Sequence, residues 1–218
     1  MKLLVFGDTH GLVDFSYLVS RSRDVDALVC VGDLTHFGRD VERVAAGLQS
    51  LLEASGKPVI LTHGNHEAGS LREALAVHAP GVVYLHQDVH VLGDVVFFGY
   101  GGGGFARHDP RVEGFLRSAH ELHASSSSVV VWLFHGPPHG TGVDVVPGLG
   151  STGCFSKRSL LDELRPHVVL AGHIHEQFGT VEEVGSSIVV NPGPDGLVVE
   201  VSYSKTNSTS TSSSGASR

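Results

Sequence analysis

Five short segments of the chain carry side chains whose donor atoms could bind metal ions. They are Asp8-Thr9-His10, Gly32-Asp33, Gly64-Asn65-His66-Glu67, His135-Gly136 and Gly172-His173-Ile174-His175. Each segment offers a carboxylate, an amide or an imidazole, and most follow a run of apolar, β-branched residues. Loops after the carboxyl ends of strands are where α/β sheets present their chemistry. Five such segments in succession indicate an enzyme.

The donor types indicate which metals would bind. Asp8 and His10 are two residues apart, so both can face the same side of an extended loop. Asp33 follows Gly32, whose missing side chain permits a sharp turn, and a carboxylate there could bridge two cations. A mixture of imidazole, carboxylate and amide ligands suits Mn, Fe, Zn, Co or Ni better than Mg or Ca.

The charge balance of such a site favours phosphate chemistry. Two divalent ions would bring four positive charges, of which Asp8, Asp33 and a bridging hydroxide would neutralise three. The site would stay cationic and attract a phosphoryl group, while the metals generate the hydroxide nucleophile. The donors therefore predict a metal-dependent phosphoesterase with two divalent ions, Mn, Fe or Zn, and a metal-bridging hydroxide.

Strands and helices alternate along the first part of the chain. Strands are expected at 2–7, 27–32 and 59–62, and helices at 14–23, 39–53 and 67–78. This alternation predicts parallel pairing with right-handed crossovers. The short strands expected at 82–85, 89–92 and 95–99 suggest antiparallel pairing at a sheet edge.

The second half of the chain supplies the remaining elements. Helices are expected at 110–123 and, with a serine N-cap, at 156–164; strands are expected at 129–134, 168–171, 178–184, 187–191 and 197–203. Residues 136–153 are rich in glycine and proline without periodicity, which indicates a long functional loop. The predicted fold class is α/β, with two sheets flanked by helices and the donors at strand ends.

Composition sets limits on the class of protein. The chain has 218 residues, 41% of them hydrophobic, which suits one domain over 1–203. Residues 204–218 are nearly all small or polar, with many Ser and Thr, so we expect a disordered tail. A net charge of −8 without a basic block argues against specific nucleic-acid binding, and the longest central apolar run is too short to cross a membrane.

The two cysteines, Cys30 and Cys154, form no CxxC pair. Cys30 falls inside an expected strand, so we expect a buried free thiol and a cytoplasmic location. The expected partner is a small phosphoester substrate, with no membrane partner, and the sequence leaves a homo-oligomer open.

The ordered segments resemble those of the calcineurin-like metallophosphoesterase superfamily over nearly the whole chain before the tail. The resemblance implies a four-layer αββα sandwich with two mixed β-sheets. It also implies that Asp8, His10, Asp33 and His175 hold one metal. Asp33, Asn65, His135 and His173 would hold the second, with Asp33 bridging, and His66 would be the catalytic residue that protonates the leaving group.

Details within the segments point to a branch of this superfamily. His36 occupies the second carboxylate position of the GDxxD pattern, and Phe37 and Gly38 follow where protein phosphatases carry an arginine. The stretch from His135 to Thr141 and the late Asn191-Pro192-Gly193 look more like the class III cyclic-nucleotide phosphodiesterase and brain-type (239AB-like) branch. The resemblance thus implies a phosphodiesterase acting on small diesters.

Several alternatives stay open. The same site would suit a phosphomonoesterase or a nucleotide pyrophosphatase, and a non-catalytic scaffold is the alternative from another class. Three further histidines, His36, His63 and His139, adjoin the donor segments and either touch substrate or face solvent. The glycines at 101–104 form either a flexible turn or a loop whose amides approach a phosphate.

Overall fold

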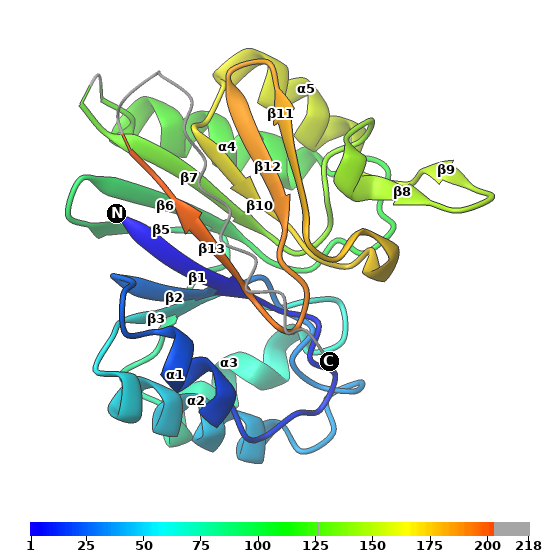
Figure 1. Cartoon of the computed structure of the whole chain (residues 1–218). Helices are drawn as coiled ribbons and strands as arrows, with labels where there is room; N and C mark the ends of the chain where they lie inside the picture. The colour runs from blue at the N-terminus through cyan, green and yellow to red at the C-terminus, as the bar shows by residue number, and fades with distance from the viewer. Residues whose placement is uncertain (126, 203–218) are drawn as a thin grey trace, which may run out of the picture.

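The computed structural model describes residues 1–125 and 127–202. Figure 1 shows four layers: α1, α2 and α3 lie below the first sheet, and α4 and α5 lie above the second. The helices are α1 (Ser16–Arg21), α2 (Val41–Ser55), α3 (Ala68–His78), α4 (Pro110–His123) and α5 (Phe155–Leu164). Two large sheets flanked by helices confirm the predicted α/β sandwich.

The first sheet has five strands in the order β13-β1-β2-β3-β4. The strands are β1 (Lys2–Phe6), β2 (Ala27–Cys30), β3 (Val59–Leu61), β4 (Val83–Tyr84) and β13 (Leu197–Glu200). Strands β1 to β4 pair in parallel, because a helix connects each strand to the next, and β13 joins β1 antiparallel at the edge.

The second sheet has six strands in the order β11-β12-β10-β7-β6-β5. They are β5 (Asp88–Leu92), β6 (Val95–Tyr100), β7 (Val129–Phe134), β10 (Val168–Leu170), β11 (Thr180–Val184) and β12 (Ser187–Asn191). The four central strands are parallel, and antiparallel β5 and β11 close the two edges.

Three apolar clusters separate the four layers. One lies between the first sheet and its helices, the second between the two sheets, and the third between the second sheet and α4 and α5. Every residue of β1 after Lys2, and all of β2, β3 and β7, is buried, because both faces of these strands are covered. This packing fixes the strand ends from which the donor segments start.

The structure corrects three details of the sequence reading. Strand β4 is not part of the antiparallel edge, because it pairs in parallel with β3. Residues 136–153 contain a 3₁₀ helix, η1 (Gly142–Asp144), and the hairpin β8 (Val145–Val146) and β9 (Gly150–Ser151), which projects to the right in Figure 1. Helix α5 begins one residue before Ser156: Cys154 is its N-cap and makes no side-chain cap bond, and the Ser156 hydroxyl, inside the helix, accepts from Asp109 N.

The expectations for the cysteines and for the C-terminal tail have different outcomes. Cys30 and Cys154 are both buried and free, as predicted for Cys30. The predicted tail at 204–218 lies outside the described residues and stays a prediction. Within 1–125 and 127–202, no helix is long and apolar enough to cross a membrane.

Candidate metal centre

The predicted donors come from both sheets. Asp8, Asp33 and Asn65 follow β1, β2 and β3 of the first sheet, whereas His135 follows β7 and the pair His173 and His175 follows β10 of the second. Hydrogen bonds between loops join the sheets here: His173 N donates to both carboxylate oxygens of Asp8, at 3.1 and 3.2 Å. The donor segments therefore meet where the carboxyl ends of the two sheets come together.

One group of three donors contains Asp8, His10 and His175, with one candidate ligand atom of each within 4.8 Å of the others. The Nε2 atoms of His10 and His175 are 3.0 Å apart, and Nε2 of His175 lies 3.6 Å from Oδ1 of Asp8. Two ring nitrogens at this distance cannot both carry a proton, so at least one lone pair faces the group.

A second group contains Asp33, His135 and His173, again with one candidate ligand atom of each within 4.8 Å of the others. Nε2 of His135 lies 3.2 Å from Oδ2 of Asp33 and 3.0 Å from Oδ1 of Asn65. Asn65 thereby joins this group with an amide oxygen. The seven donors named from the sequence are thus all brought into two adjoining groups.

Each histidine of the second group directs a ring nitrogen at the place where a metal ion would bind. His135 is fully buried, and its Nδ1 lies 3.0 Å from the carbonyl oxygen of Val31, so Nδ1 holds the proton and Nε2 faces Asp33. Nε2 of His173 is buried and has no hydrogen-bond partner among the described residues. Burial lowers the pKa of His173 to about 3, which keeps its ring neutral. These residues fit a bound divalent cation.

The carboxylates differ in their electrostatic surroundings. Burial raises the pKa of Asp8 to about 6, although His135 and His175 act in the opposite direction. Burial also raises the pKa of Asp33, but a second proton on His135, at Nε2, would donate to Oδ2 of Asp33. This hydrogen bond and the charge of the ring outweigh burial, and the pKa of Asp33 falls to about 2. Asp33 is therefore ionised throughout the physiological range and suited to attract cations.

Backbone strain is concentrated at the candidate ligands. Among the described residues, eight other than glycine have positive φ, and four of them are Asp8, His10, Asp33 and His173, with φ of 54°, 47°, 50° and 72°. Left-handed backbone is unfavourable for residues with a Cβ and is maintained where the surroundings enforce it, often at functional sites. The fold thus holds these donors in fixed, costly conformations.

Two glycines allow the carboxylates to sit close to neighbouring backbone. A Cβ on Gly64 would collide with Oδ1 of Asp33, and a Cβ on Gly172 would collide with Oδ2 of Asp8. The glycines that precede Asn65 and His173 are therefore a steric requirement of the site.

Glu67 organises the loops after β2 and β3, a role that the sequence reading missed. Its buried carboxylate accepts hydrogen bonds from the backbone N–H of Asp33, Thr35 and Gly64 and from the hydroxyl of Thr35. The donor pattern itself offered no signal, because Glu67 reads as one more carboxylate beside Asn65 and His66.

Two residues outside the donor segments anchor the loops after β7. Lys157 is buried in α5, and its Nζ donates to the carbonyl oxygen of Gly136 at 2.6 Å. Asp144 is fully buried and accepts from the backbone N–H of Gly140, Thr141 and Gly153. The sequence gives no sign that Lys157 is buried, because a lysine on an amphipathic helix is expected to face solvent.

His66 lies beside the cluster. Its Nε2 is 3.8 Å from Oδ2 of Asp33, and its Nδ1 is 3.3 Å from the carbonyl oxygen of Thr35. His66 also forms a third group of candidate ligands with His10 and exposed His36, within 4.8 Å. The geometry therefore admits two roles for His66, a proton donor or a ligand.

The other residues considered from the sequence have identifiable surroundings. Nδ1 of His63 lies 2.7 Å from the hydroxyl of Tyr84, and Nδ1 of His139 lies 3.6 Å from Oδ2 of Asp144. The glycines at 101–104 pack against the cluster, since a Cβ on Gly104 would lie 3.3 Å from Oδ1 of Asn65.

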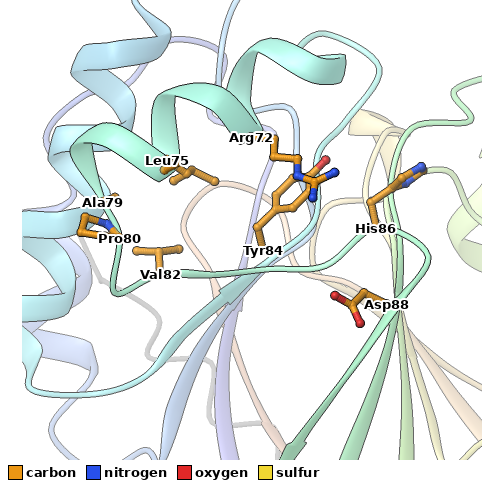
Figure 2. A pocket seen from close by; sticks show the side chains of 9 residues that line it. Arg72, Leu75, Ala79, Pro80, Val82, Tyr84, His86 and Asp88 are labelled. Atoms are coloured by element: carbon orange, nitrogen blue, oxygen red, sulfur yellow. The ribbon is translucent and has the colours of Figure 1, made fainter.

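A separate cavity of about 230 Å³ lies at the β4 edge of the first sheet. Figure 2 shows Arg72 of α3 beside Tyr84, with His86 and Asp88 on the other side. No predicted metal donor lines this cavity. Tyr84 and His86 of its lining both contact His63, which adjoins the donor segment at 64–67.

Comparison with known proteins gives a family and a fold. The sequence model described as Calcineurin-like phosphoesterase matches residues 1–177. The uncharacterized protein MJ1162 of Methanocaldococcus jannaschii is 26% identical over 211 residues, which cover 91% of each protein.

Solved structures share the fold at low identity. TT1561 of Thermus thermophilus superposes with a TM-score of 0.69 at 22% identity, covering 91% of this chain and 93% of that one. The phosphopantetheinyl hydrolase PptH of Mycobacterium tuberculosis superposes with a TM-score of 0.59 at 11% identity, covering 88% of both chains.

Proposed function

The chain belongs to the calcineurin-like phosphoesterase family, and on that premise we propose that it hydrolyses small phosphodiesters at a two-metal centre. Family membership makes it a metal-dependent hydrolase of phosphoesters. The number of metals, the ligand set and the diester preference are our proposal. We propose that Asp8, His10, Asp33 and His175 hold one metal, and Asp33, Asn65, His135 and His173 the other.

The observation that carries this proposal is the pairing of two donor groups. Each contains one buried aspartate and two histidines, and each corresponds to one half of the proposed ligand set. Isolated buried carboxylates and imidazoles cost free energy unless they are paired or bind a metal. Two such groups side by side support a binuclear centre.

Two divalent ions bound there would polarise the phosphoryl oxygens and activate a water molecule at neutral pH. The protein's own residues orient the ligands and manage protons. Nδ1 of His66 donates to the carbonyl oxygen of Thr35, which directs Nε2 toward the cluster. In the imidazolium form Nε2 also carries a proton, and that proton is available to the leaving oxygen. His66 then acts as the general acid.

The diester preference rests on the supply of positive charge. Two cations near the cluster are engaged with backbone: Arg107 donates to the carbonyl oxygen of Ser151, and Lys157 of α5 donates to that of Gly136. A diester monoanion needs less compensating charge than a monoester dianion. Where protein phosphatases of the family carry an arginine, this chain has exposed Phe37 and Gly38.

The test compares kcat/KM for bis-p-nitrophenyl phosphate, p-nitrophenyl phosphate and a phosphopeptide, each with protein loaded with the same metal. We expect the highest value for the diester and two metal ions per chain by elemental analysis. A phosphopeptide advantage would contradict the diester preference alone. Absence of turnover on all three substrates, with metal bound, would favour the scaffold alternative.

A further inference from the structure

Three exposed phenylalanines lie against three different histidines of the candidate metal centre. Their contacts, as distances between ring centroids, are Phe37 to His66 at 3.9 Å, Phe105 to His173 at 4.4 Å, and Phe178 to His175 at 4.9 Å. Single exposed apolar side chains are common and need no explanation. Three that border one cluster form an aromatic rim around it.

Phe37 and Phe105 are the most exposed members of this rim, with 68% and 61% of their surface open. Phe37 stacks on His66 with an interplanar angle of 19°, so one ring face covers the imidazole. Phe105 meets His173 edge-on, at 65°. The two rings thus border different parts of the site, Phe37 beside the proposed proton donor and Phe105 beside the second donor group.

The turn that carries Phe37 is held in an unfavourable conformation. Phe37 has φ of 54° and Gly38 has φ of 75°, both left-handed. Gly38 N donates to Oγ1 of Thr35 at 3.0 Å, and Thr35 is itself bound by the buried carboxylate of Glu67. A relaxed loop would not keep a phenylalanine in this region. The same clamp that orients Asp33 therefore also positions Phe37.

Building on the proposed function, we propose that Phe37 binds a flat aromatic group on the leaving alcohol of the substrate and so selects esters that carry one. Aromatic side chains at an open site bind rings by stacking, and the interaction tolerates any flat π-system. One face of Phe37 covers His66, so the ring on the leaving alcohol packs against the exposed part of Phe37, beside the histidine that protonates its oxygen. A nucleobase or a simple aryl group supplies this chemistry.

The test uses two diesters that differ only in the ring of the leaving alcohol. Methyl benzyl phosphate and methyl cyclohexylmethyl phosphate release primary alcohols, one with a flat ring and one with a saturated ring of similar size. Release of each alcohol is followed by chromatography for wild type, Phe37→Leu, Phe105→Leu and Phe37→Tyr. Leu122→Ala removes an equally exposed apolar side chain on α4, away from the cluster, and is the control.

We expect wild type to favour the benzyl ester. We expect Phe37→Leu to lower kcat/KM for that ester by about three- to tenfold, from the usual strength of an aromatic pair, with little change for the cyclohexylmethyl ester. Phe37→Tyr should restore the preference, and Leu122→Ala should not alter it. Phe105 borders the other donor group, so Phe105→Leu should change the preference less than Phe37→Leu. Metal content is measured for each variant.

An equal decrease in kcat/KM for both esters in Phe37→Leu would overturn the proposal. The Phe37 ring would then serve only to cover His66. Absence of turnover of bis-p-nitrophenyl phosphate by metal-loaded wild type would instead contradict the proposed function. The methyl ester of adenosine 5′-monophosphate distinguishes the two sources of the ring. A higher kcat/KM than for methyl benzyl phosphate assigns a nucleobase, and a lower one assigns a simple aryl group.

Discussion

Replacing Glu67 by glutamine tests whether one buried carboxylate positions the metal ligands of the first sheet. Oε1 accepts from N and Oγ1 of Thr35, at 2.7 and 3.0 Å, and Oε2 accepts from N of Asp33 and Gly64, at 3.1 and 2.8 Å. In glutamine, one oxygen becomes an NH₂ group. If this group faces Asp33 and Gly64, it opposes two backbone donors. If it faces Thr35, the hydroxyl can turn to accept, and one backbone N–H stays unpaired.

The second orientation sets the smallest loss. The unpaired backbone N–H of Thr35 costs about 1–3 kcal/mol. The two bonds that remain, from N of Asp33 and of Gly64, each lose about 1 kcal/mol when the acceptor is no longer charged. Burial raises the pKa of Glu67, which means that the charged form itself is costly, and the neutral amide avoids this cost. We therefore expect a net loss of about 2–3 kcal/mol in the free energy of unfolding for Glu67→Gln, a large share of the usual 5–15 kcal/mol.

The assay is urea unfolding of metal-free protein with chelator present, followed by circular dichroism and linear extrapolation. Glu73→Gln makes the same substitution at an exposed position of α3 and should change stability by less than about 0.5 kcal/mol. Metal content of Glu67→Gln should also fall, because the loops that carry Asp33 and Asn65 lose their common anchor.

Equal stability of Glu67→Gln and Glu73→Gln, with full metal content in both, would refute this reasoning. A loss of stability without a loss of metal would restrict the role of Glu67 to folding.

Three other substitutions test separate parts of the site. Asp33→Asn should abolish turnover and lower metal content more than Asn65→Ala, because the bridging carboxylate serves both ions; full occupancy with normal rates would contradict bridging. His66→Ala should slow alkyl esters far more than nitrophenyl esters, which leave without a proton, and should retain metal; loss of metal would assign His66 to the group with His10 and His36 instead. Burial lowers the pKa of Lys157 from 10.5 to about 8, so its charged form is a cost that is fully present below pH 8 and disappears as pH rises to 10.5. Unfolding titrations across this window should show wild type gaining roughly 3 kcal/mol relative to Lys157→Met, and parallel curves would contradict the buried charge.

The sequence was sufficient for features that depend on local pattern. Helix α4 and strand β7 match their expected bounds of 110–123 and 129–134, because amphipathic and fully apolar segments are unambiguous. The seven donors also meet as expected, since strand ends fix their positions. Their roles as ligands stay a prediction.

Features that depend on contacts distant in sequence could not be read in this way. The pairing of β4 with β3 depends on the crossover through α3, and the short segment at 82–85 carries no signal for it. Ser156 was expected as the helix cap, but the helix begins at Phe155, and the Ser156 hydroxyl accepts from N of Asp109, which comes from another part of the chain. The anchoring roles of Glu67 and Lys157 likewise require knowledge of which backbone groups lie opposite them.

The bare backbone of Gly64 and Gly172 has a consequence for how this site can be lost during evolution. A single methyl group at either position would displace the carboxylate of Asp33 or Asp8 while every donor residue remained in the sequence. Gly64→Ala should therefore yield an inactive descendant whose ligand inventory still looks complete. Genomic surveys that score only the histidines and aspartates would count such a pseudoenzyme as competent. The two glycines belong in any sequence signature used to infer activity.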